Sequence, residues 1–243
     1  CRFYNNQVGF AGGGVLNDAS MATVERCLFS GNTAMGGAAV CGYLDASRVV
    51  NCVAVHNTAP YFGGAVFNYG GTSAYVNCTF AFNTAVTGGG AMLNYASAAP
   101  VIVNCILWGN KLDSGIPSEI ESSGATPSVT YSCVEGGYAG AGNIVADPLF
   151  TDAEHNLFTL QSGSPCIDTG TPSNAPLDDF NGLVRPQDYL WDMGAFEAPR
   201  ANTEPCAFLV DVDNVSGIEN GRTWATAYAS IASEIGRASC RER

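Results

Sequence analysis

The stretch CTFAFNTAVTGGGAMLNYASAAPVIVN, from Cys78 to Asn104, decides the fold because similar stretches precede and follow it. Five copies share the form C-x-x-x-x-N and read CRFYNN at Cys1, CLFSGN at Cys27, CVAVHN at Cys52, CTFAFN at Cys78 and CILWGN at Cys105. YSCVEGG around Cys133 is interpreted as a decayed sixth copy. The six cysteines are separated by 26, 25, 26, 27 and 28 residues. An internal repeat of this period is typical of a solenoid.

Within each copy the apolar residues alternate in steps of two, as Val76, Cys78 and Phe80 do against Asn77 and Thr79. This is the side-chain period of a β-strand, and no apolar stripe at helical spacing is visible. Short strands joined by turns use roughly 20–30 residues per coil in parallel β-solenoids. The sequence therefore predicts an all-β solenoid of parallel strands, with about 25–28 residues per coil.

Three sets of residues are expected to direct the stacking of the coils. The first is one inward column of thiols, Cys27, Cys52, Cys78 and Cys105. The second is a hydrogen-bonded ladder of turn residues with left-handed backbone, Asn32, Asn57, Asn83 and Asn110. The third comprises the glycine pairs that let the chain bend, Gly13-Gly14, Gly36-Gly37, Gly63-Gly64 and Gly89-Gly90, followed by a slot holding Asn17, Cys41, Asn68 and Asn94.

One residue does not fit the predicted inward pattern. Glu25 stands at the position where the neighbouring copies carry Val50, Val76 and Val103. A carboxylate in the core would be costly to bury, so we expect a β-bulge there that turns Glu25 outward.

The repeats resemble those of a known protein family. GGAVFN at Gly63 and GGAMLN at Gly89, together with F-x-x-N, resemble the repeats of bacterial polymorphic outer-membrane proteins, and more broadly those of secreted right-handed parallel β-helices of the pectate-lyase-like type. The segments Asp147–Gly170 and Asp178–Glu197 resemble the closing part of bacterial choice-of-anchor β-helix proteins. The resemblance implies right-handed coils in an extracellular or bacterial cell-surface protein.

The same motifs suggest how the chain is divided. Residues 1–137 are expected to form the coils, 138–198 the closing segment and 199–205 a linker. Residues 206–233 resemble the start of a second, truncated β-helix domain. The last ten residues, EIGRASCRER, back-translate to a sequence that resembles a common sequencing adapter, so we expect 234–243 to be adapter read-through.

Composition excludes some partners. The chain of 243 residues has 10 Lys and Arg against 22 Asp and Glu, a formal charge of −12. Nucleic acid and anionic membrane surfaces both need a basic protein face, so neither is an expected partner, and no transmembrane segment is visible.

The cysteines lack a C-x-x-C pattern, and stacked ones are poorly spaced for a disulfide, so the column is interpreted as buried free thiols. Whether Cys41, Cys166 and Cys206 are oxidised stays open.

Candidate catalytic and metal-binding residues are few. Asp178 and Asp179 resemble the acid pair of a glycosidase, but they lie in the closing motif, where aspartates cap turns. Oxygen ligands for calcium are offered by Asp147, Asp152, Asp211 and Asp213, without a recognised calcium-binding spacing. Turn capping is the favoured interpretation for both groups, and no cofactor is predicted.

Two functions remain open at this point. The first is a non-catalytic extracellular or cell-surface β-helix that contacts glycans or proteins, as an adhesin or a stalk. The alternative is a polysaccharide lyase or glycoside hydrolase whose active coils lie mostly outside this sequence. The coils carry few titratable side chains, and they place small polar residues at most non-core positions. The first function is therefore the one that the sequence favours.

Overall fold

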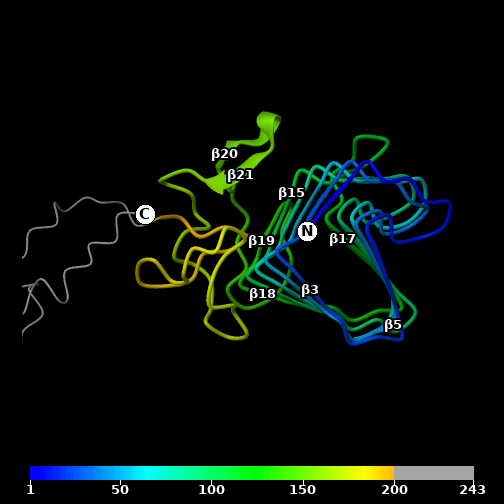
Figure 1. The fold of residues 1–243 in the computed structure, drawn as a ribbon, viewed down its shortest axis with the longest axis horizontal. Coiled ribbons are helices and arrows are strands. Elements are labelled where there is room, and N and C mark those ends of the chain that lie inside the picture. The colour runs from blue at the N-terminus through cyan, green and yellow to red at the C-terminus, as the bar shows by residue number, and fades with distance from the viewer. Residues whose placement is uncertain (200–243) are drawn as a thin grey trace, which may run out of the picture. The chain divides into compact units, whose positions relative to one another are not determined.

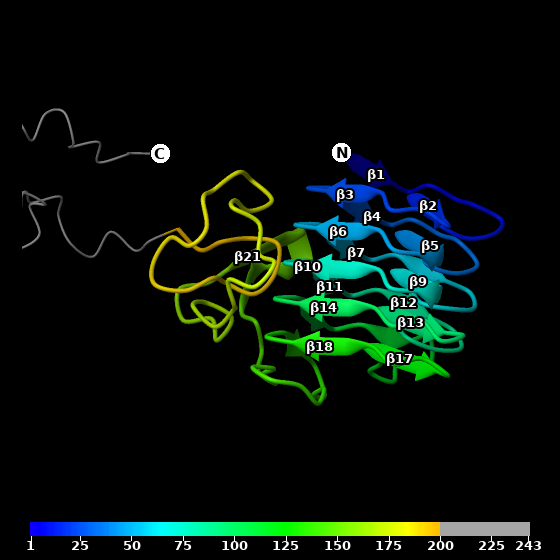
Figure 2. The same cartoon turned by 90° about the horizontal axis from the view of Figure 1, so that it is seen from below.

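The computed structural model describes residues 1–199, and the predicted all-β parallel solenoid is confirmed in them (Figures 1 and 2). Three parallel sheets run along the stack of coils, and we number them 1 to 3. The predicted second-domain start at 206–233, the tail at 234–243 and all but residue 199 of the predicted linker lie outside the described residues.

Each sheet takes one strand from each coil. Sheet 1 consists of β1 (Arg2–Tyr4), β4 (Leu28–Ser30), β7 (Val53–Val55), β11 (Thr79–Ala81), β15 (Ile106–Trp108) and β19 (Cys133–Val134). Sheet 2 consists of β3 (Thr23–Glu25), β6 (Arg48–Val50), β10 (Ala74–Val76), β14 (Val101–Val103) and β18 (Ser128–Thr130). Sheet 3 consists of β2 (Val15–Asp18), β5 (Val40–Asp45), β9 (Val66–Gly71), β13 (Met92–Tyr95) and β17 (Ile120–Ser123). A short fourth sheet holds β8 (Thr58–Ala59), β12 (Thr84–Ala85) and β16 (Lys111–Leu112).

The core is a set of columns in which equivalent side chains of successive coils stack. Strand pairing joins residues about one repeat apart, as in Thr23 with Arg48, then Arg48 with Ala74. The inward column of sheet 2 consists of Val24, Val49, Tyr75, Ile102 and Val129. The inward column of sheet 1 consists of Phe29, Ala54, Phe80, Leu107 and Val134. The thiol column, Cys27, Cys52, Cys78 and Cys105, lies at the turn between these two sheets. All but the half-buried Val24 are buried.

The expected bulge at Glu25 is wrong. Glu25 pairs with Val50 in unbroken register, and Val24 is the residue of that strand that packs on the core. The position of Glu25 therefore faces outward in every coil. The alternation read from the sequence was one residue out of phase in sheet 2, because a turn residue separates that sheet from the thiol column.

That turn consists of a single residue in left-handed conformation. Asn51, Asn77 and Asn104 have φ of 49°, 49° and 53°, and each directly precedes a cysteine of the thiol column. Left-handed backbone was predicted instead for the ladder residues Asn32, Asn57, Asn83 and Asn110, and this is wrong: the residue before each of them has the positive φ, namely Gly31, His56, Phe82 and Gly109. Asparagine suits a left-handed position because its short polar side chain makes local hydrogen bonds.

The glycine pairs were also misaligned. The left-handed glycines of four successive coils are Gly12, Gly37, Gly63 and Gly89, with φ of 56° to 70°. A Cβ at Gly63 would collide with the carbonyl oxygen of Val66, so the tight turn requires glycine there. The buried slot lies five residues after each of these glycines and holds Asn17, Gly42, Asn68 and Asn94. Cys41 is therefore outside this slot and lies on the outer side of sheet 3.

The closing segment packs along the flank of the coils (Figure 2). It contains the antiparallel pair β20 (Phe150–Asp152) and β21 (Leu157–Leu160), joined by the 3₁₀ turn η1 (Ala153–His155). Its apolar side chains form a second core with the outward residues of sheet 1: Phe150, Phe158, Cys166, Met193 and Ala195 against Val53, Val55, Ala81, Ile106 and Cys133.

The left-handed asparagines of the coils hold this segment in place. Asn51 Nδ2 donates to the carbonyl of Asp178 at 2.7 Å, and Asn77 Nδ2 donates to that of Asp192 at 2.9 Å. Asn104 Nδ2 donates to the carbonyl of Thr171 at 2.8 Å. The repeat therefore contains two rows of asparagine, one for stacking coils and one for docking the closing segment.

Candidate ligand-contact face

The ladder asparagines form a continuous and directional row of hydrogen bonds. The Nδ2 and backbone N of Asn57 both donate to Oδ1 of Asn83, at 2.9 Å each. Asn83 donates in the same way to Oδ1 of Asn110, at 2.9 and 2.8 Å. A second bond from Nδ2 of Asn83 reaches the carbonyl of Ala54 at 2.9 Å. These amides are fully buried, so their role is to join the coils and not to contact a ligand.

The ladder ends on a buried carboxylate. Asn110 donates its backbone N–H to Oε1 of Glu119 at 3.0 Å and its Nδ2 to Oε2 at 2.6 Å. Burial raises the pKa of Glu119 to about 8, although the two bonds from Asn110 act in the opposite direction. Sequence reasoning missed Glu119, which lies nine residues after Asn110 and outside the repeat pattern.

The column thiols Cys27, Cys52, Cys78 and Cys105 are buried and free. Backbone amides donate to their sulfur atoms across coils, from Cys27 to Cys52 and from Cys78 to Cys105, at 3.4 Å each. Burial raises the pKa of Cys52 and Cys78, so both thiols stay protonated at neutral pH.

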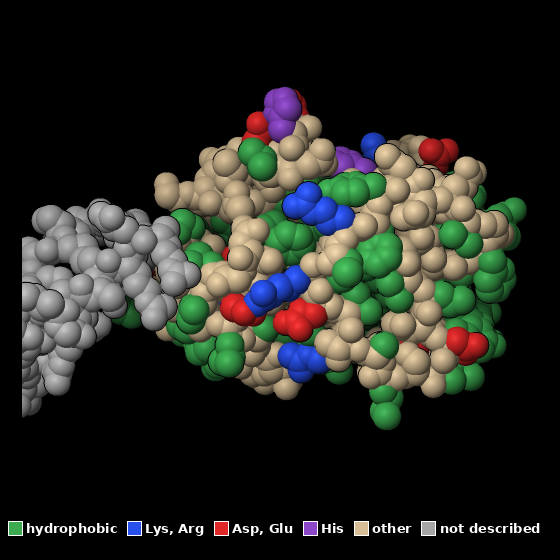
Figure 3. Space-filling model, in the orientation of Figure 1, with side chains coloured by type: hydrophobic (Ala, Val, Ile, Leu, Met, Phe, Trp, Pro, Cys, Tyr) green, Lys and Arg blue, Asp and Glu red, His purple; other side chains and the backbone are tan. Residues whose placement is uncertain are grey.

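Asp178 and Asp179 are not arranged as a catalytic pair. Asp179 is buried, and its carboxylate accepts from the backbone amides of Asn181, Leu183 and Glu197 at 2.8, 2.7 and 3.0 Å. Asp178 forms an ion pair with Arg26 of the coils. On the face drawn in Figure 3, charged side chains gather along the seam between the coils and the closing segment.

The two candidate calcium ligands within the described residues, Asp147 and Asp152, each serve a local turn. Asp147 accepts from the backbone N of Leu149 at 2.9 Å, and Asp152 caps η1 by accepting from the backbone N and Nδ1 of His155 at 3.2 and 2.7 Å. Within residues 1–199 no group of three or more potential metal ligands is present. Asp211 and Asp213 lie outside the described residues.

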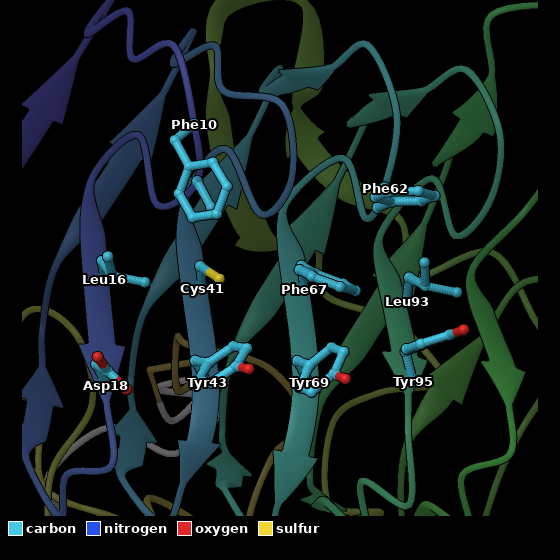
Figure 4. A pocket seen from close by; sticks show the side chains of 11 residues that line it. Phe10, Leu16, Asp18, Cys41, Tyr43, Phe62, Phe67, Tyr69, Leu93 and Tyr95 are labelled. Carbon is cyan, nitrogen blue, oxygen red and sulfur yellow. The ribbon is translucent and has the colours of Figure 1, made fainter.

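The outer side of sheet 3 carries aromatic and aliphatic side chains in two columns (Figure 4). Strand register places Leu16, Cys41, Phe67 and Leu93 in one column and Asp18, Tyr43, Tyr69 and Tyr95 in the other. The ring centroids of Tyr43 and Tyr69 are 4.7 Å apart with an interplanar angle of 10°, and those of Tyr69 and Tyr95 are 5.7 Å apart at 38°. The tyrosines thus form a ladder of their own with their edges toward solvent.

Two phenylalanines from the preceding turns form the opposite wall. Phe10 is 72% exposed, and Phe62 stacks on Phe67 with ring centroids 5.6 Å apart. Between these walls lies a groove of about 730 Å³. Ala11 and Gly36 hold the positions equivalent to Phe62 in the two preceding coils, so the wall is not aromatic in every coil. We call this surface the aromatic groove; it lies on the side of the solenoid away from the closing segment (Figure 1).

The aromatic groove has little charge. Asp18 is the one charged side chain among the residues that line it. Burial, followed by the nearby carboxylates Asp45 and Asp18, raises the pKa of Cys41 to about 12, so this thiol is neutral at physiological pH. The groove therefore combines apolar surface with tyrosine hydroxyls, and a single carboxylate at one end.

This face was not predicted. Small polar residues were expected at most non-core positions, whereas the outer side of sheet 3 is largely aromatic and aliphatic. A signal was present, since Tyr43, Tyr69 and Tyr95 recur at intervals of 26 residues. With the glycine pairs misaligned, the three tyrosines could not be recognised as one column.

Comparisons with protein-family models, with curated proteins and with solved structures found no match to this chain. The strand pairing establishes a parallel β-solenoid, and the comparisons assign this chain to no family. Among the described residues, no helix has the length and apolar character needed to cross a membrane.

Proposed function

We propose that this protein is a non-catalytic extracellular or bacterial cell-surface module that binds an extended neutral glycan in the aromatic groove. The observation that carries this proposal is the column of Tyr43, Tyr69 and Tyr95 facing the Phe62 wall. The extracellular setting rests on the resemblance of the repeats and the closing segment to secreted β-helix proteins.

The shape of the groove suits a linear ligand. The lining residues come from four successive coils, which at about 4.8 Å per coil span about 14 Å along the stack. A sugar ring has apolar C–H faces and hydroxyl groups around its edge. The exposed rings of Phe10 and Phe62 can pack against the apolar C–H faces of the sugar, and the tyrosine hydroxyls can form hydrogen bonds with its hydroxyl groups.

The charges favour a neutral ligand over an acidic one. The groove lining contains Asp18 and no arginine, lysine or histidine. The whole chain has a formal charge of −12, which repels polyuronates. A glycosidase needs two carboxylates on opposite sides of the scissile bond, and the lining supplies one, which supports binding without cleavage.

The test is affinity gel electrophoresis of the full chain in gels that contain soluble neutral glycans, such as xylan, mannan or hydroxyethyl cellulose, or polygalacturonate. We expect retardation by at least one neutral glycan and at least about a tenfold loss of affinity in Tyr69→Ala and Phe62→Ala, equivalent to about 1.4 kcal/mol. Tyr189→Ala is the matched control, because Tyr189 is 87% exposed on the closing segment. Equal retardation of Tyr69→Ala and Tyr189→Ala, or retardation by polygalacturonate alone, would overturn the proposal, as would release of reducing ends.

A further inference from the structure

The last cysteine of the repeat has left the thiol column. Cys105 N donates to Oγ of Ser132 at 3.1 Å, at the place where the earlier coils present a sulfur. Cys133 pairs instead with Ile106 in the register of sheet 1. The 28-residue spacing from Cys105 to Cys133 is thus one residue too long, and one residue reverses the direction of a strand side chain. A sixth coil is present, since β18 and β19 continue sheets 2 and 1, but Cys133 is one residue out of phase with the thiol column.

Cys133 faces the closing segment, and Cys166 meets it there. Both side chains are fully buried in the second core, with Ile106 and Met193. Cys166 is fixed from both sides, because its backbone N donates to Oγ of Ser164 at 3.1 Å and its carbonyl accepts from Met193 N at 2.9 Å. Cys133 Sγ donates to the carbonyl of Ala146 at 3.1 Å, and the thiol of Cys166 is close enough to interact with that of Cys133.

We propose that Cys133 and Cys166 form a disulfide that fastens the closing segment to the last coil when the protein folds in oxidising surroundings. The thiol column differs in geometry. Its members point in parallel from neighbouring strands about 4.8 Å apart, whereas a disulfide prefers Cβ atoms about 3.8 Å apart. Cys133 and Cys166 instead come from two packed layers, the last coil and the closing segment, and belong to the same buried core.

The chemistry is an exchange with a small-molecule disulfide such as oxidised glutathione. Before the closing segment has packed, the Cys133 thiolate attacks the small disulfide. Its sulfur bonds to one sulfur of the oxidant, the oxidant's S–S bond breaks, and the leaving thiolate takes a proton. Cys166 then attacks the Cys133 sulfur and expels the second small thiol. Two protein thiols and one small disulfide thus give one protein disulfide and two small thiols.

Burial sets the order of events. Because both sulfur atoms are inaccessible in the folded protein, exchange occurs before the closing segment has packed. Once formed, the bond is screened from reductant by the second core. We therefore expect slow reduction of the folded protein and rapid reduction after unfolding.

The experiment is to refold the full chain in oxidised and reduced glutathione, block free thiols and map disulfides by mass spectrometry without reduction. We expect one linked peptide pair, containing Cys133 and Cys166. Thermal unfolding is then compared with and without prior reduction, in wild type, Cys166→Ala and the control Cys78→Ala. Oxidation should raise the unfolding midpoint by about 5–10 °C in wild type and in Cys78→Ala, and not in Cys166→Ala.

The peptide map on wild type decides the matter even if a variant fails to fold. Free Cys133 and Cys166 after oxidative refolding would overturn the proposal. A link within the thiol column, or one from Cys133 or Cys166 to any other cysteine of the chain, would overturn it as well.

Discussion

Asn110 and Glu119 meet through two parallel hydrogen bonds, one from the backbone N–H and one from the side-chain amide, to the two oxygens of one carboxylate. Every other rung of the ladder ends on an amide oxygen, which cannot titrate. The last rung is the one whose strength depends on pH.

This rung predicts that the protein loses stability as the pH rises. The pKa of Glu119 is about 8 in the folded protein, above its ordinary value, so the folded state holds a proton that the unfolded chain has released. The stabilising effect of protonation is complete below the ordinary value of about 4.5 and is lost as the pH rises toward 8, with a slope approaching 1.4 kcal/mol per pH unit. Urea unfolding of wild type and Glu119→Gln between pH 5 and 9 measures it. A difference between the two proteins that does not vary with pH would contradict the prediction. Comparing the two proteins removes the contribution of Glu197, whose pKa is also raised by burial.

A mid-ladder asparagine should be more important for stability than an exposed one. Asn83→Ala removes two bonds to Asn110 and Ala54 and leaves the buried donors of Asn57 without an acceptor. Unsatisfied buried groups cost about 1–3 kcal/mol each, so we expect a loss of at least that size in the free energy of unfolding. Asn181→Ala, with an exposed side chain, is the matched control. Equal urea midpoints for both variants would refute the assigned role.

The left-handed asparagines should respond differently to glycine and to alanine. Asn77 has φ of 49°, and its amide donates to the carbonyls of Asp192 and Gly194. Asn77→Gly loses the side-chain hydrogen bonds but keeps an unstrained backbone. Asn77→Ala loses the same hydrogen bonds and also strains the left-handed backbone. We expect Asn77→Ala to be less stable than Asn77→Gly by about 1–2 kcal/mol in chemical unfolding. The reverse order would show that this turn is not under conformational constraint.

Asp178 and Asp179 should differ strongly in their contribution to stability. Asp179→Ala leaves three backbone amides, one buried and two partly buried, without their acceptor, and hydrogen bonds to a charged group contribute about 1.5–3 kcal/mol each. Asp178→Ala removes an ion pair with Arg26 that is partly exposed, and such pairs contribute about 0–1 kcal/mol. Calorimetric unfolding of the two variants gives the comparison. Similar unfolding temperatures would be inconsistent with the turn-capping geometry.

The repeat made the solenoid predictable, because cysteine and asparagine recur at a nearly constant distance through sheet 1 and the turn that follows it. Phase within the other sheets was not predictable from alternation alone. Asn77 occupies a one-residue turn, so the inward residues Tyr75 and Cys78 are three positions apart instead of two. The same turn explains why Glu25 faces outward, whereas Cys133 is displaced because its repeat is one residue longer.

The aromatic groove depended on this phase. Whether Tyr43 and Tyr69 lie side by side is settled by the register of sheet 3, and that register depends on which glycine begins the turn. Gly37 and Gly63 occupy equivalent positions, but Gly37 is the second glycine of its pair, whereas Gly63 is the first glycine of its pair. Local sequence carries no sign of this difference, since both pairs read Gly-Gly-Ala.

The direction of the asparagine ladder has a consequence for how such a protein can change in length. Each coil offers donors to the next coil and an acceptor to the previous one, so every junction from Asn6 to Asn110 is interchangeable. A duplicated coil could be inserted at any of these junctions and would find both of its faces already matched. The side chain of Glu119 accepts hydrogen bonds from Asn110 but has no amide group to donate to a further coil, so the ladder cannot be extended beyond it. Lengthening by whole coils would extend the aromatic groove, if the new coil carried its tyrosine, without altering either end of the ladder.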